Sequence, residues 1–179
     1  MSLEIIYKEK CNTPSDINEH LPTLKKYAEE CDHVTEFGVR WIVSTYALLM
    51  GKPKKMVSYD IEDIEMELVQ NMVKENTELK FIQGDSTKIE IEETDLLFID
   101  TIHTYEHLKK ELSLHSSKVK KYIILHDTTV YEWEGEAING VTQKGLWPAI
   151  EEFLESNPNW VIYERFEYNN GLTILKRNI

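Results

Sequence analysis

The sequence predicts an α/β fold: a mostly parallel sheet with helices on both faces that ends in an antiparallel hairpin. Short apolar runs alternate with amphipathic stretches, a pattern typical of strands that cross over through helices. Several runs stop on an acid or a histidine, and the last two runs are separated by a turn sequence. At 179 residues, the chain suits one domain over 1–179.

Residues 1–32 are expected to form a helical lead-in. Its clearest helix is PTLKKYAEEC, which begins at Pro22, because proline is tolerated in the first turn of a helix. Each later apolar run is bounded by polar or turn residues, as expected of buried strands. The predicted parallel strands are, in chain order, HVTEFG (33–38), KMVSYD (55–60), LKFIQGD (79–85), TDLLFID (94–100) and KKYIILHD (120–127).

Helices are predicted between these strands from the spacing of apolar residues. The stretch 61–76 places Ile64, Leu68 and Met72 at helical spacing. Between the fourth and fifth strands, one apolar helix face is predicted from Tyr105, Leu108, Leu112, His115 and Val119. Both stretches are expected to be crossover helices that return the chain to the sheet.

The last part of the chain is predicted to contain a long loop, a helix and a hairpin. Residues 128–144 include Gly135 and Gly140 and show no sustained period, so we expect a loop over the sheet edge that acts as a lid. A helix begins near Trp147. The runs WVIYERFEY and LTILKR, joined by NNG, predict the hairpin. Together with the parallel strands, it would give a seven-stranded mixed sheet with one reversed strand.

Composition and charge argue against several classes of function. The 20 basic and 32 acidic residues give a formal net charge of −12, which disfavours nucleic acid and anionic membranes as partners. No run approaches the roughly 20 apolar residues that span a bilayer, and MSLEIIYKEK lacks the apolar core of a signal peptide. Cys11 and Cys31 are not spaced like a zinc or redox motif. We therefore expect a cytoplasmic protein with reduced thiols.

Polar side chains follow the predicted parallel strands where those strands end. The residues are Asp60, Asp85, Asp100, His126 and Asp127. In open α/β sheets, ligands bind in the crevice outside the carboxyl ends of the strands. One acid at such a position is common because solvent covers it. Its repetition at neighbouring strand ends predicts a single binding site.

Several motifs, in order, resemble those of the class I S-adenosylmethionine-dependent methyltransferases. EFGVR (36–40), followed by Ser44, is similar to the glycine-containing loop of that family, Asp60 to its ribose acid, and GDS (84–86) to its adenine segment. More narrowly, FIDTIHTYEHLKKEL, IILHDT, GLWPAIEEFL and NNGLTIL resemble the branch of cephalosporin-hydroxylase-like proteins and metal-dependent sugar O-methyltransferases. The resemblance covers roughly 33–177 and implies a Rossmann-like methyltransferase fold.

The resemblance implies a site for S-adenosylmethionine. Its candidate residues are Glu36, Gly38, Arg40, Ser44, Asp60, Asp85 and Ser86. In the family, the glycine loop lies against the methionine part of the cofactor, the ribose acid holds the sugar hydroxyls and the later aspartate accepts from the adenine amino group. The role of Asp60 also follows from chemistry, since one carboxylate can accept both vicinal hydroxyls. For Glu36, the alternative is an interior acid paired with a backbone amide or with Arg40.

One position departs from the family pattern. The family loop carries a second glycine a few residues after the first, where this chain has Trp41, Ile42 and Val43. Glycine is used where the backbone must approach a ligand closely or adopt a positive φ. The departure leaves open weak cofactor binding, a displaced loop, or a non-catalytic protein that keeps the fold.

The resemblance also implies a divalent metal site, in which Asp100, His126 and Asp127 match the ligand positions. Carboxylates suit Mg²⁺. An imidazole at His126 suits Mn²⁺ or another transition metal, and the alternative is a histidine outside the ligand shell. His103 stands where the sugar-modifying branch has its general base, and histidine titrates near neutral pH. The alternative is a solvent-exposed histidine at the start of a helix.

These inferences lead to one hypothesis and two alternatives. The hypothesis is S-adenosylmethionine-dependent methylation of a hydroxyl on a small acceptor, such as a carbohydrate, with a divalent metal holding the acceptor oxygen. The alternatives are a non-catalytic binding protein and a hydroxylase- or hydrolase-like use of the same metal edge, because a fold does not fix function. A homo-oligomer is compatible with the short N-terminal segment, which leaves little chain to cover the acceptor.

Overall fold

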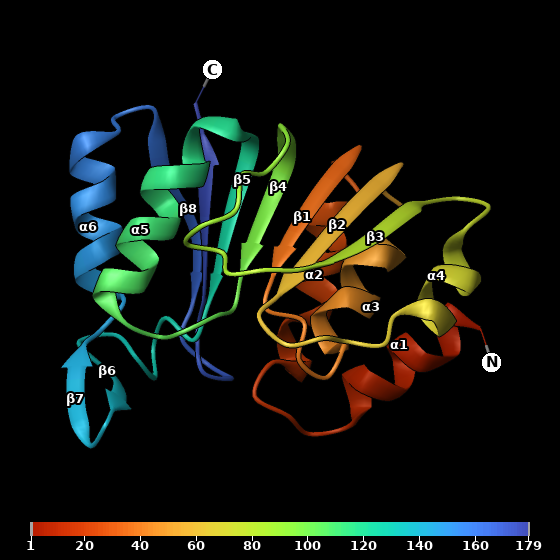
Figure 1. The fold of residues 1–179 in the computed structure, drawn as a ribbon, viewed down its shortest axis with the longest axis horizontal. Helices are drawn as coiled ribbons and strands as arrows, with labels where there is room; N and C mark the ends of the chain where they lie inside the picture. The colour runs from red at the N-terminus through yellow and green to blue at the C-terminus, as the bar shows by residue number, and fades with distance from the viewer. Residues whose placement is uncertain (1, 179) are drawn as a thin grey trace.

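The structure, a computed structural model, describes residues 2–178, which form a central sheet flanked by helices (Figure 1). The elements are α1 Leu3–Asn12, η1 Asn18–His20, α2 Leu21–Ala28, β1 His33–Phe37, α3 Val43–Met50, β2 Lys55–Asp60, α4 Glu67–Val73, β3 Glu78–Gln83, β4 Thr94–Ile99, α5 Tyr105–His115, η2 Ser116–Lys118, β5 Val119–His126, β6 Glu134–Ile138, β7 Val141–Lys144, α6 Trp147–Ser156, β8 Trp160–Phe166 and β9 Leu172–Arg177. No helix within this described part is long and apolar enough to cross a membrane.

The main sheet has seven strands in the order β3-β2-β1-β4-β5-β9-β8. Strands β1 to β5 pair in parallel, and β9 runs antiparallel to both β5 and β8. The carboxyl ends of the parallel strands therefore point to one edge of the sheet, the lower edge in Figure 1. This topology confirms the predicted mixed sheet with one reversed strand and a C-terminal hairpin.

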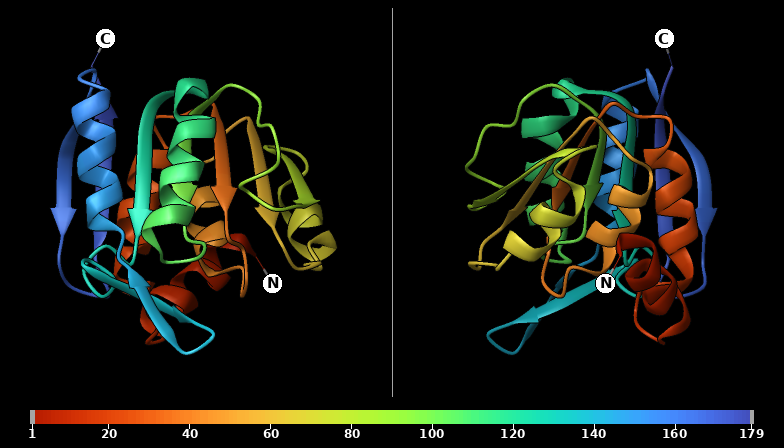
Figure 2. Two further views of the ribbon diagram at one scale, coloured as in Figure 1. Left: turned by 60° about the vertical axis from the view of Figure 1, so that its left-hand side comes forward. Right: turned by 90° about the vertical axis from the view of Figure 1, so that its right-hand side faces the viewer.

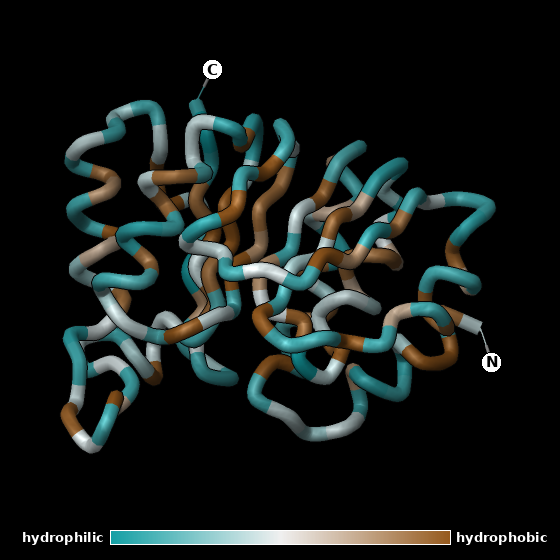
Figure 3. The backbone as a smooth tube through the Cα atoms, in the orientation of Figure 1, coloured by the Kyte–Doolittle hydropathy of each residue, from teal (hydrophilic) through white to brown (hydrophobic). Residues whose placement is uncertain are grey.

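Alternating strand residues fill two apolar layers, one on each face of the sheet. Val34, Leu96 and Ile124 belong to the layer closed by α1 to α4, whereas Leu97 and Ile123 belong to the layer closed by α5 and α6. Successive side chains of a strand point to opposite faces, so a parallel sheet covered on both sides is apolar throughout. Figure 2 shows helices on both sides, and Figure 3 shows hydrophobic stretches in the central strands.

The expected helical lead-in consists of α1, η1 and α2. Pro22 stands in the first turn of α2, as predicted. Leu24 and Tyr27 of the same helix are buried against the sheet. Between α1 and α2, the chain is tied to the β8–β9 turn, because the side-chain amide of Asn169 donates to the carbonyl of Ser15 (2.8 Å).

The helix after β2 is shorter than expected. α4 spans Glu67–Val73 rather than 61–76, and Leu68, expected on its apolar face, is 64% exposed. The carboxylate of Asp60 accepts from the backbone N–H of Glu62 (2.9 Å), which turns the chain immediately after the strand. An aspartate that bonds to the backbone two residues on offers an alternative to the helix.

The crossover helix α5 ends earlier than the apolar spacing indicates. Leu108 and Leu112 are buried on its inner face, as predicted. A 3-10 turn follows the helix at Ser116–Lys118, and Val119 is the first residue of β5. The prediction that Val119 extends the helix face is therefore wrong.

The predicted loop at 128–144 contains a two-stranded sheet, β6–β7, which projects below the body in Figure 1. Its turn is Asn139-Gly140, with φ angles of 52° and 78°. An Asn-Gly pair is a strong hairpin signal because both residues tolerate positive φ. The expectation of an irregular loop is therefore wrong here. The strands have only five and four residues, too few to establish a sustained period.

Candidate functional site

A cavity of about 680 Å³ opens at the carboxyl edge of the sheet, around the ends of β1, β2, β3 and β4. The order of the strands reverses between β1 and β4, which is where open α/β sheets bind ligands. The sequence-predicted residues in its wall are Gly38, Arg40, Ser44, Asp60, Asp85, Ser86, Asp100 and His103. Glu36, His126 and Asp127 are buried and do not line it.

Gly38 lets two strand ends approach closely. Its φ is +85°, and a Cβ on this residue would lie 1.8 Å from the carbonyl oxygen of Asp100. The backbone N–H of Asp100 in turn donates to the carbonyl of Phe37 (2.9 Å). Only glycine satisfies both constraints. The residue is therefore required to bring the loop after β1 beside the end of β4.

The loop after Gly38 turns without a second glycine. Arg40 and Ile42 adopt left-handed φ angles of 39° and 60°. Trp41, between them, is 74% exposed and lines the cavity. Non-glycine residues in this region of φ are uncommon and mark turns or functional positions. Side chains therefore occupy the place of the missing glycine, as expected, while the turn itself is present.

Asp60 holds the same loop. Its Oδ2 accepts from the backbone N–H groups of Val39 (2.7 Å) and Arg40 (3.0 Å). Its Oδ1 accepts from the backbone of Glu62 (2.9 Å). A carboxylate oxygen can accept more than one hydrogen bond, so Asp60 keeps acceptor capacity toward the cavity. The residue thus serves the loop and remains available for a ligand.

Asp85 is engaged by its own turn. Oδ1 accepts from the N–H and hydroxyl of Thr87 (2.9 and 2.6 Å), and Oδ2 pairs with Lys88 (2.6 Å), a side chain 75% exposed. The hydrogen bond from Lys88, followed by those from Thr87, lowers the pKa of Asp85. A ligand that donates to Oδ2 would displace an exposed lysine.

Ser86 is connected to α5 through Glu111, which sequence reasoning did not single out. The carboxylate of Glu111 is fully buried, and its Oε1 accepts from the hydroxyls of Ser86 (2.6 Å) and Thr101 (2.9 Å). His107, which lines the cavity, places Nε2 3.3 Å from the same oxygen. Glu111 therefore joins the loops after β3 and β4.

Glu36 lies beneath the cavity wall rather than in it. Its buried carboxylate accepts from the hydroxyls of Ser44 (2.7 Å), Thr45 (2.9 Å) and Ser58 (2.7 Å). Burial raises its pKa, the three hydroxyls oppose that rise, and the charge of Asp100 adds to it, so the pKa is about 7. The predicted alternative of an interior, paired acid describes its surroundings, with hydroxyls as partners in place of Arg40.

Arg40 is paired with the N-terminal segment. Its guanidinium lies 2.7 Å from the carboxylate of Asp16, and Ser15, Asp16 and Ile17 all line the cavity. Asp16 also reaches the buried side of the site, because its carbonyl accepts from Nε2 of His126 (3.1 Å). The lead-in thus supplies one wall of the cavity.

Two of the predicted metal residues, Asp100 and Asp127, meet the predicted base His103 at the ends of β4 and β5. Asp100, His103 and Asp127 each offer one ligand atom, and these atoms lie within 4.8 Å of one another. His103 Nε2 is 2.7 Å from Asp127 Oδ2 and 3.3 Å from Asp100 Oδ1. The backbone of Asp127 is left-handed, with φ 59°, and the residue is only 4% exposed, so its carboxylate is buried.

His126 faces the same carboxylates with its second ring nitrogen. Nδ1 lies 3.4 Å from Asp100 and 3.5 Å from Asp127. Nε2 donates to the carbonyl of Asp16, so in the neutral ring Nδ1 carries a lone pair. Nδ1 and Asp127 Oδ1 are both buried and have no hydrogen-bond partner within residues 2–178. Burial acts to lower the pKa of His126, but the hydrogen bonds and charges of the two carboxylates raise it to about 10, so Nδ1 holds a proton unless a cation takes its place. This donor set therefore fits a divalent cation.

His103 is held by the hairpin on its other side. Its Nδ1 contacts Glu136 of β6, and its ring stacks on Tyr131 with centroids 4.6 Å apart and an interplanar angle of 9°. Burial acts to lower the pKa of His103, but its hydrogen bonds to Asp100 and Asp127 and their charges raise it to about 10. The imidazole is therefore protonated at neutral pH when these carboxylates carry no other cation.

Sequence reasoning missed Asp16, Glu111 and Glu136. No local pattern marks Asp16, whereas Glu111 lies at helical spacing between Leu108 and His115, an acid on an apolar helix face that could have signalled a buried partner. Glu136 follows Gly135, whose Cβ would lie 2.4 Å from the carbonyl of His103. A glycine beside an acid within the Asn-Gly hairpin was the one available signal of a close approach.

Comparison with known proteins places this geometry in context. A model of the family described as rhamnosyl O-methyltransferase/CmcI matches residues 27–178 of the chain. A search of the curated proteins found no match.

The fold is shared with solved methyltransferase structures. A protein assigned as a caffeoyl-CoA O-methyltransferase from Staphylococcus aureus has a TM-score of 0.64 at 14% identity, over 99% of this chain and 93% of that one. The N-methyltransferase NodS from Bradyrhizobium japonicum, in complex with S-adenosyl-L-homocysteine, has a TM-score of 0.67 at 11% identity, over 99% of both chains. The S-adenosyl-L-homocysteine-bound methyltransferase PaMTH1 from Podospora anserina has a TM-score of 0.60 at 15% identity, over 99% and 88%. These likenesses confirm the predicted Rossmann-like methyltransferase fold.

Proposed function

The chain belongs to the rhamnosyl O-methyltransferase/CmcI family and is an S-adenosylmethionine-dependent O-methyltransferase, and we propose that its acceptor is a hydroxyl of a sugar or other small polyol beside a divalent metal ion. The family match over residues 27–178 supports the reaction type. The meeting of Asp100 and Asp127 beside His103 is the observation that carries the metal-assisted mechanism.

The cofactor assignment follows the shared cavity. S-adenosylmethionine supplies the methyl group when bound. We assign its methionine part to the loop at Gly38 and Arg40, its ribose to Asp60 and its adenine to Asp85, because all four residues line one continuous cavity at the ends of neighbouring strands. Ser86 and Ser44 line the same wall, and Ser44 donates to Glu36, which supports the loop from beneath.

The proposed metal ligands are Asp100, Asp127 and Nδ1 of His126. A divalent metal ion there would polarise the acceptor hydroxyl and offset the carboxylate charges that keep His103 protonated. Mg²⁺ suits the carboxylates and Mn²⁺ suits the added imidazole. Nδ1 of His126 and Oδ1 of Asp127 have no hydrogen-bond partner among the described residues. This supports the assignment, since buried polar atoms without partners are costly.

His103 is the proposed general base. Nε2 of His103 would accept the hydroxyl proton as the acceptor oxygen takes the methyl group and S-adenosylhomocysteine leaves. The side chain lies in the cavity wall, beside the carboxylates that would hold the metal ion. A base in hydrogen-bond reach contributes about 10²–10⁴-fold to the rate.

Calorimetry tests the metal separately from the cofactor. Purified protein is titrated with Mg²⁺, with Mn²⁺ and with S-adenosylhomocysteine. Asp100→Asn and Asp127→Asn should lose metal binding and retain binding of S-adenosylhomocysteine. Asp63→Asn, which changes an exposed acid on the loop after β2, is the matched control. Metal isotherms unchanged in both site variants would reject this ligand set.

The acceptor is sought with labelled S-adenosylmethionine and a panel of methyl glycosides and polyols, with and without chelator. Methyl transfer should require the metal. His103→Ala should reduce the rate about 10²–10⁴-fold and retain metal binding, whereas His126→Ala should weaken metal binding. Full methyl transfer in excess chelator would show that the reaction needs no metal ion. A wild-type rate in His103→Ala would show that His103 is not the general base.

A further inference from the structure

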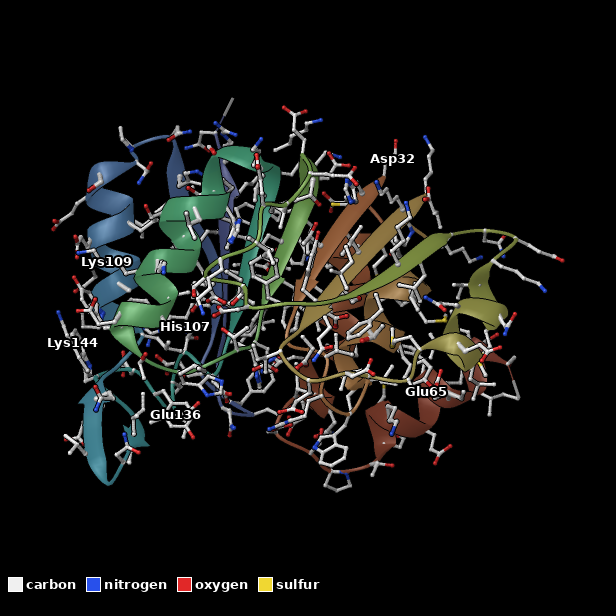
Figure 4. The ribbon with its side chains drawn as sticks, viewed as in Figure 1. Asp32, Glu65, His107, Lys109, Glu136 and Lys144 are labelled. Atoms are coloured by element: carbon white, nitrogen blue, oxygen red, sulfur yellow. The ribbon has the colours of Figure 1, made fainter. Side chains whose placement is uncertain are left out.

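The hairpin β6–β7 brings a carboxylate to the side of His103 that faces away from the proposed metal residues. Figure 4 shows Glu136 and Lys144 on this hairpin, which sits below α5. Oε1 of Glu136 contacts Nδ1 of His103 and also accepts from the backbone N–H of His103 (3.0 Å). The backbone N–H of Glu136 donates to the carbonyl of His103 (3.0 Å). Side chain and backbone of the two residues are therefore both paired.

This pairing depends on a close approach that only a small residue allows. Gly135 precedes Glu136, and a Cβ at this position would lie 2.4 Å from the carbonyl of His103 and 2.8 Å from that of Lys144. Tyr131, on the segment leading into the hairpin, stacks on the flat face of the imidazole. His103 is thus fixed by Glu136 along one ring edge and by Tyr131 across one ring face.

We propose that Glu136 is a positioning residue, which keeps the proton on Nδ1 of His103 and so leaves Nε2 as the nitrogen that exchanges protons with the acceptor. The carboxylate accepts from Nδ1–H in the neutral ring and in the imidazolium. It thereby fixes both the tautomer and the ring orientation, with Nε2 directed to Asp127 and Asp100. This role rests on the proposed function of His103 as base.

The hairpin has few other contacts that could set its position. It is a two-stranded sheet separate from the main sheet, and such a hairpin is marginally stable alone. Beyond Glu136, its tip exposes Ile138 (45%) and Val141 (62%). At its base, Lys144 lies over the ring of Tyr105 on α5, 3.9 Å from the centroid. Loss of the Glu136 carboxylate should therefore remove the partner of Nδ1 of His103 without disturbing the main sheet.

The test combines proton NMR of the histidine ring with turnover. Protein labelled with ¹⁵N in its imidazole rings is observed with Mg²⁺ and S-adenosylhomocysteine. We expect a slowly exchanging, downfield proton on Nδ1 of His103 in the wild type. It should be lost in Glu136→Ala, shifted in Glu136→Gln and unchanged in Glu134→Ala, which removes an exposed acid from the same strand. Glu136→Gln keeps the size of the side chain and covers the case in which the alanine variant fails to fold.

Turnover is measured on the glycoside that the wild-type enzyme methylates. Removing a partner that orients a functional histidine costs about 10–100-fold in activity. We expect a fall of this size in kcat for Glu136→Ala, with unchanged affinity for S-adenosylhomocysteine. A Glu136→Ala spectrum that keeps the Nδ1 proton at its wild-type position would overturn the proposal. If Glu136→Ala loses that proton but His103→Ala turns over at the wild-type rate, the contact between Glu136 and His103 is confirmed and the role of His103 as base is rejected.

Discussion

At the scale of single residues, the site depends on contacts that only one type of residue can make. Gly38 is the clearest case, since the space of its missing Cβ is taken by the carbonyl of Asp100. The contact joins the loop proposed for the cofactor to the strand end proposed for the metal. A change at Gly38 should therefore affect both.

The first prediction compares two glycines of similar conformation. Gly38 has φ +85°, and a Cβ added to it would meet a backbone oxygen at 1.8 Å, whereas Gly140 has φ +78° and an added Cβ would meet no described atom within 4 Å. Gly140→Ala should cost only the left-handed backbone penalty, about 1–2 kcal/mol of unfolding free energy. Gly38→Ala should cost more than this and abolish binding of S-adenosylhomocysteine. Urea unfolding and calorimetry measure the two effects.

Equal losses of stability in the two glycine variants, with cofactor binding retained in both, would contradict this view. The close approach at Gly38 would then be relieved by a small movement of the loop.

The second prediction concerns the pH dependence caused by Glu36. Its pKa is about 7 in the folded protein against an ordinary value of 4.5, so the native state holds a proton that the unfolded state has released between these values. The contribution of Glu36 to the free energy of unfolding should therefore fall as pH rises from 4.5 to 7. The shift corresponds to about 3 kcal/mol at 1.36 kcal/mol per unit.

Glu36→Gln removes the titrating group and keeps its shape. Urea unfolding of both proteins in chelator, at pH values below and above this range, should show the wild type losing about 3 kcal/mol relative to the variant. Parallel stability curves for the two proteins would show that Glu36 does not titrate in this range.

At the scale of elements, the hairpin differs from the rest of the sheet. β4 and β5 are paired on both sides and buried, whereas β6 and β7 pair only with each other in the described part of the chain. Segments with few buried contacts open locally at low free energy. The mobility expected of the predicted lid should therefore be found in β6 and β7.

The third prediction is that the hairpin exchanges its amide hydrogens faster than β4 in the absence of ligands. Addition of Mg²⁺ and S-adenosylhomocysteine should slow exchange at Glu136, because its N–H is bonded to the carbonyl of His103. Hydrogen exchange with mass spectrometry measures both, and peptides from β4 are the internal control. Ligand-free exchange as slow in the hairpin as in β4 would argue against a mobile lid.

At the scale of the whole molecule, acidic charge dominates both the surface and the cavity. The formal net charge is −12. The acids that line the cavity are Asp16, Asp60, Glu62, Asp85, Asp100 and Glu136. The arginine of this wall, Arg40, is already paired with Asp16. We therefore expect the cavity to disfavour an anionic acceptor.

The fourth prediction follows from this charge. An uncharged glycoside should be methylated with a kcat/KM at least about tenfold higher than the same sugar carrying a phosphate, since repulsion between like charges readily exceeds about 1.4 kcal/mol. The difference should narrow at high salt, which screens exposed charges. Paired assays at low and high ionic strength measure it. A phosphorylated acceptor preferred at low salt would reverse the conclusion.

The sequence by itself determined the strands, their polar ends and the closing hairpin. Buried strands need apolar runs, and parallel strands end at one edge, so Asp60, Asp85, Asp100 and Asp127 could be placed together from the order of residues alone. The family motifs added the reaction type and the expectation that the loop after β1 binds the cofactor. These are local signals, read within a few residues.

Only the tertiary structure decided which side chains complete the site. Glu136 meets His103 from 33 residues away, Glu111 meets Ser86 from 25, and Asp16 meets Arg40 from 24. None of these acids stands at a strand end, and although Glu111 lies at helical spacing from Leu108 and His115 on the buried face of α5, that spacing does not identify its partner. Their meetings depend on where the hairpin, α5 and the lead-in pack against the sheet. Local periodicity reports which face of an element is buried, but not which distant element lies against it.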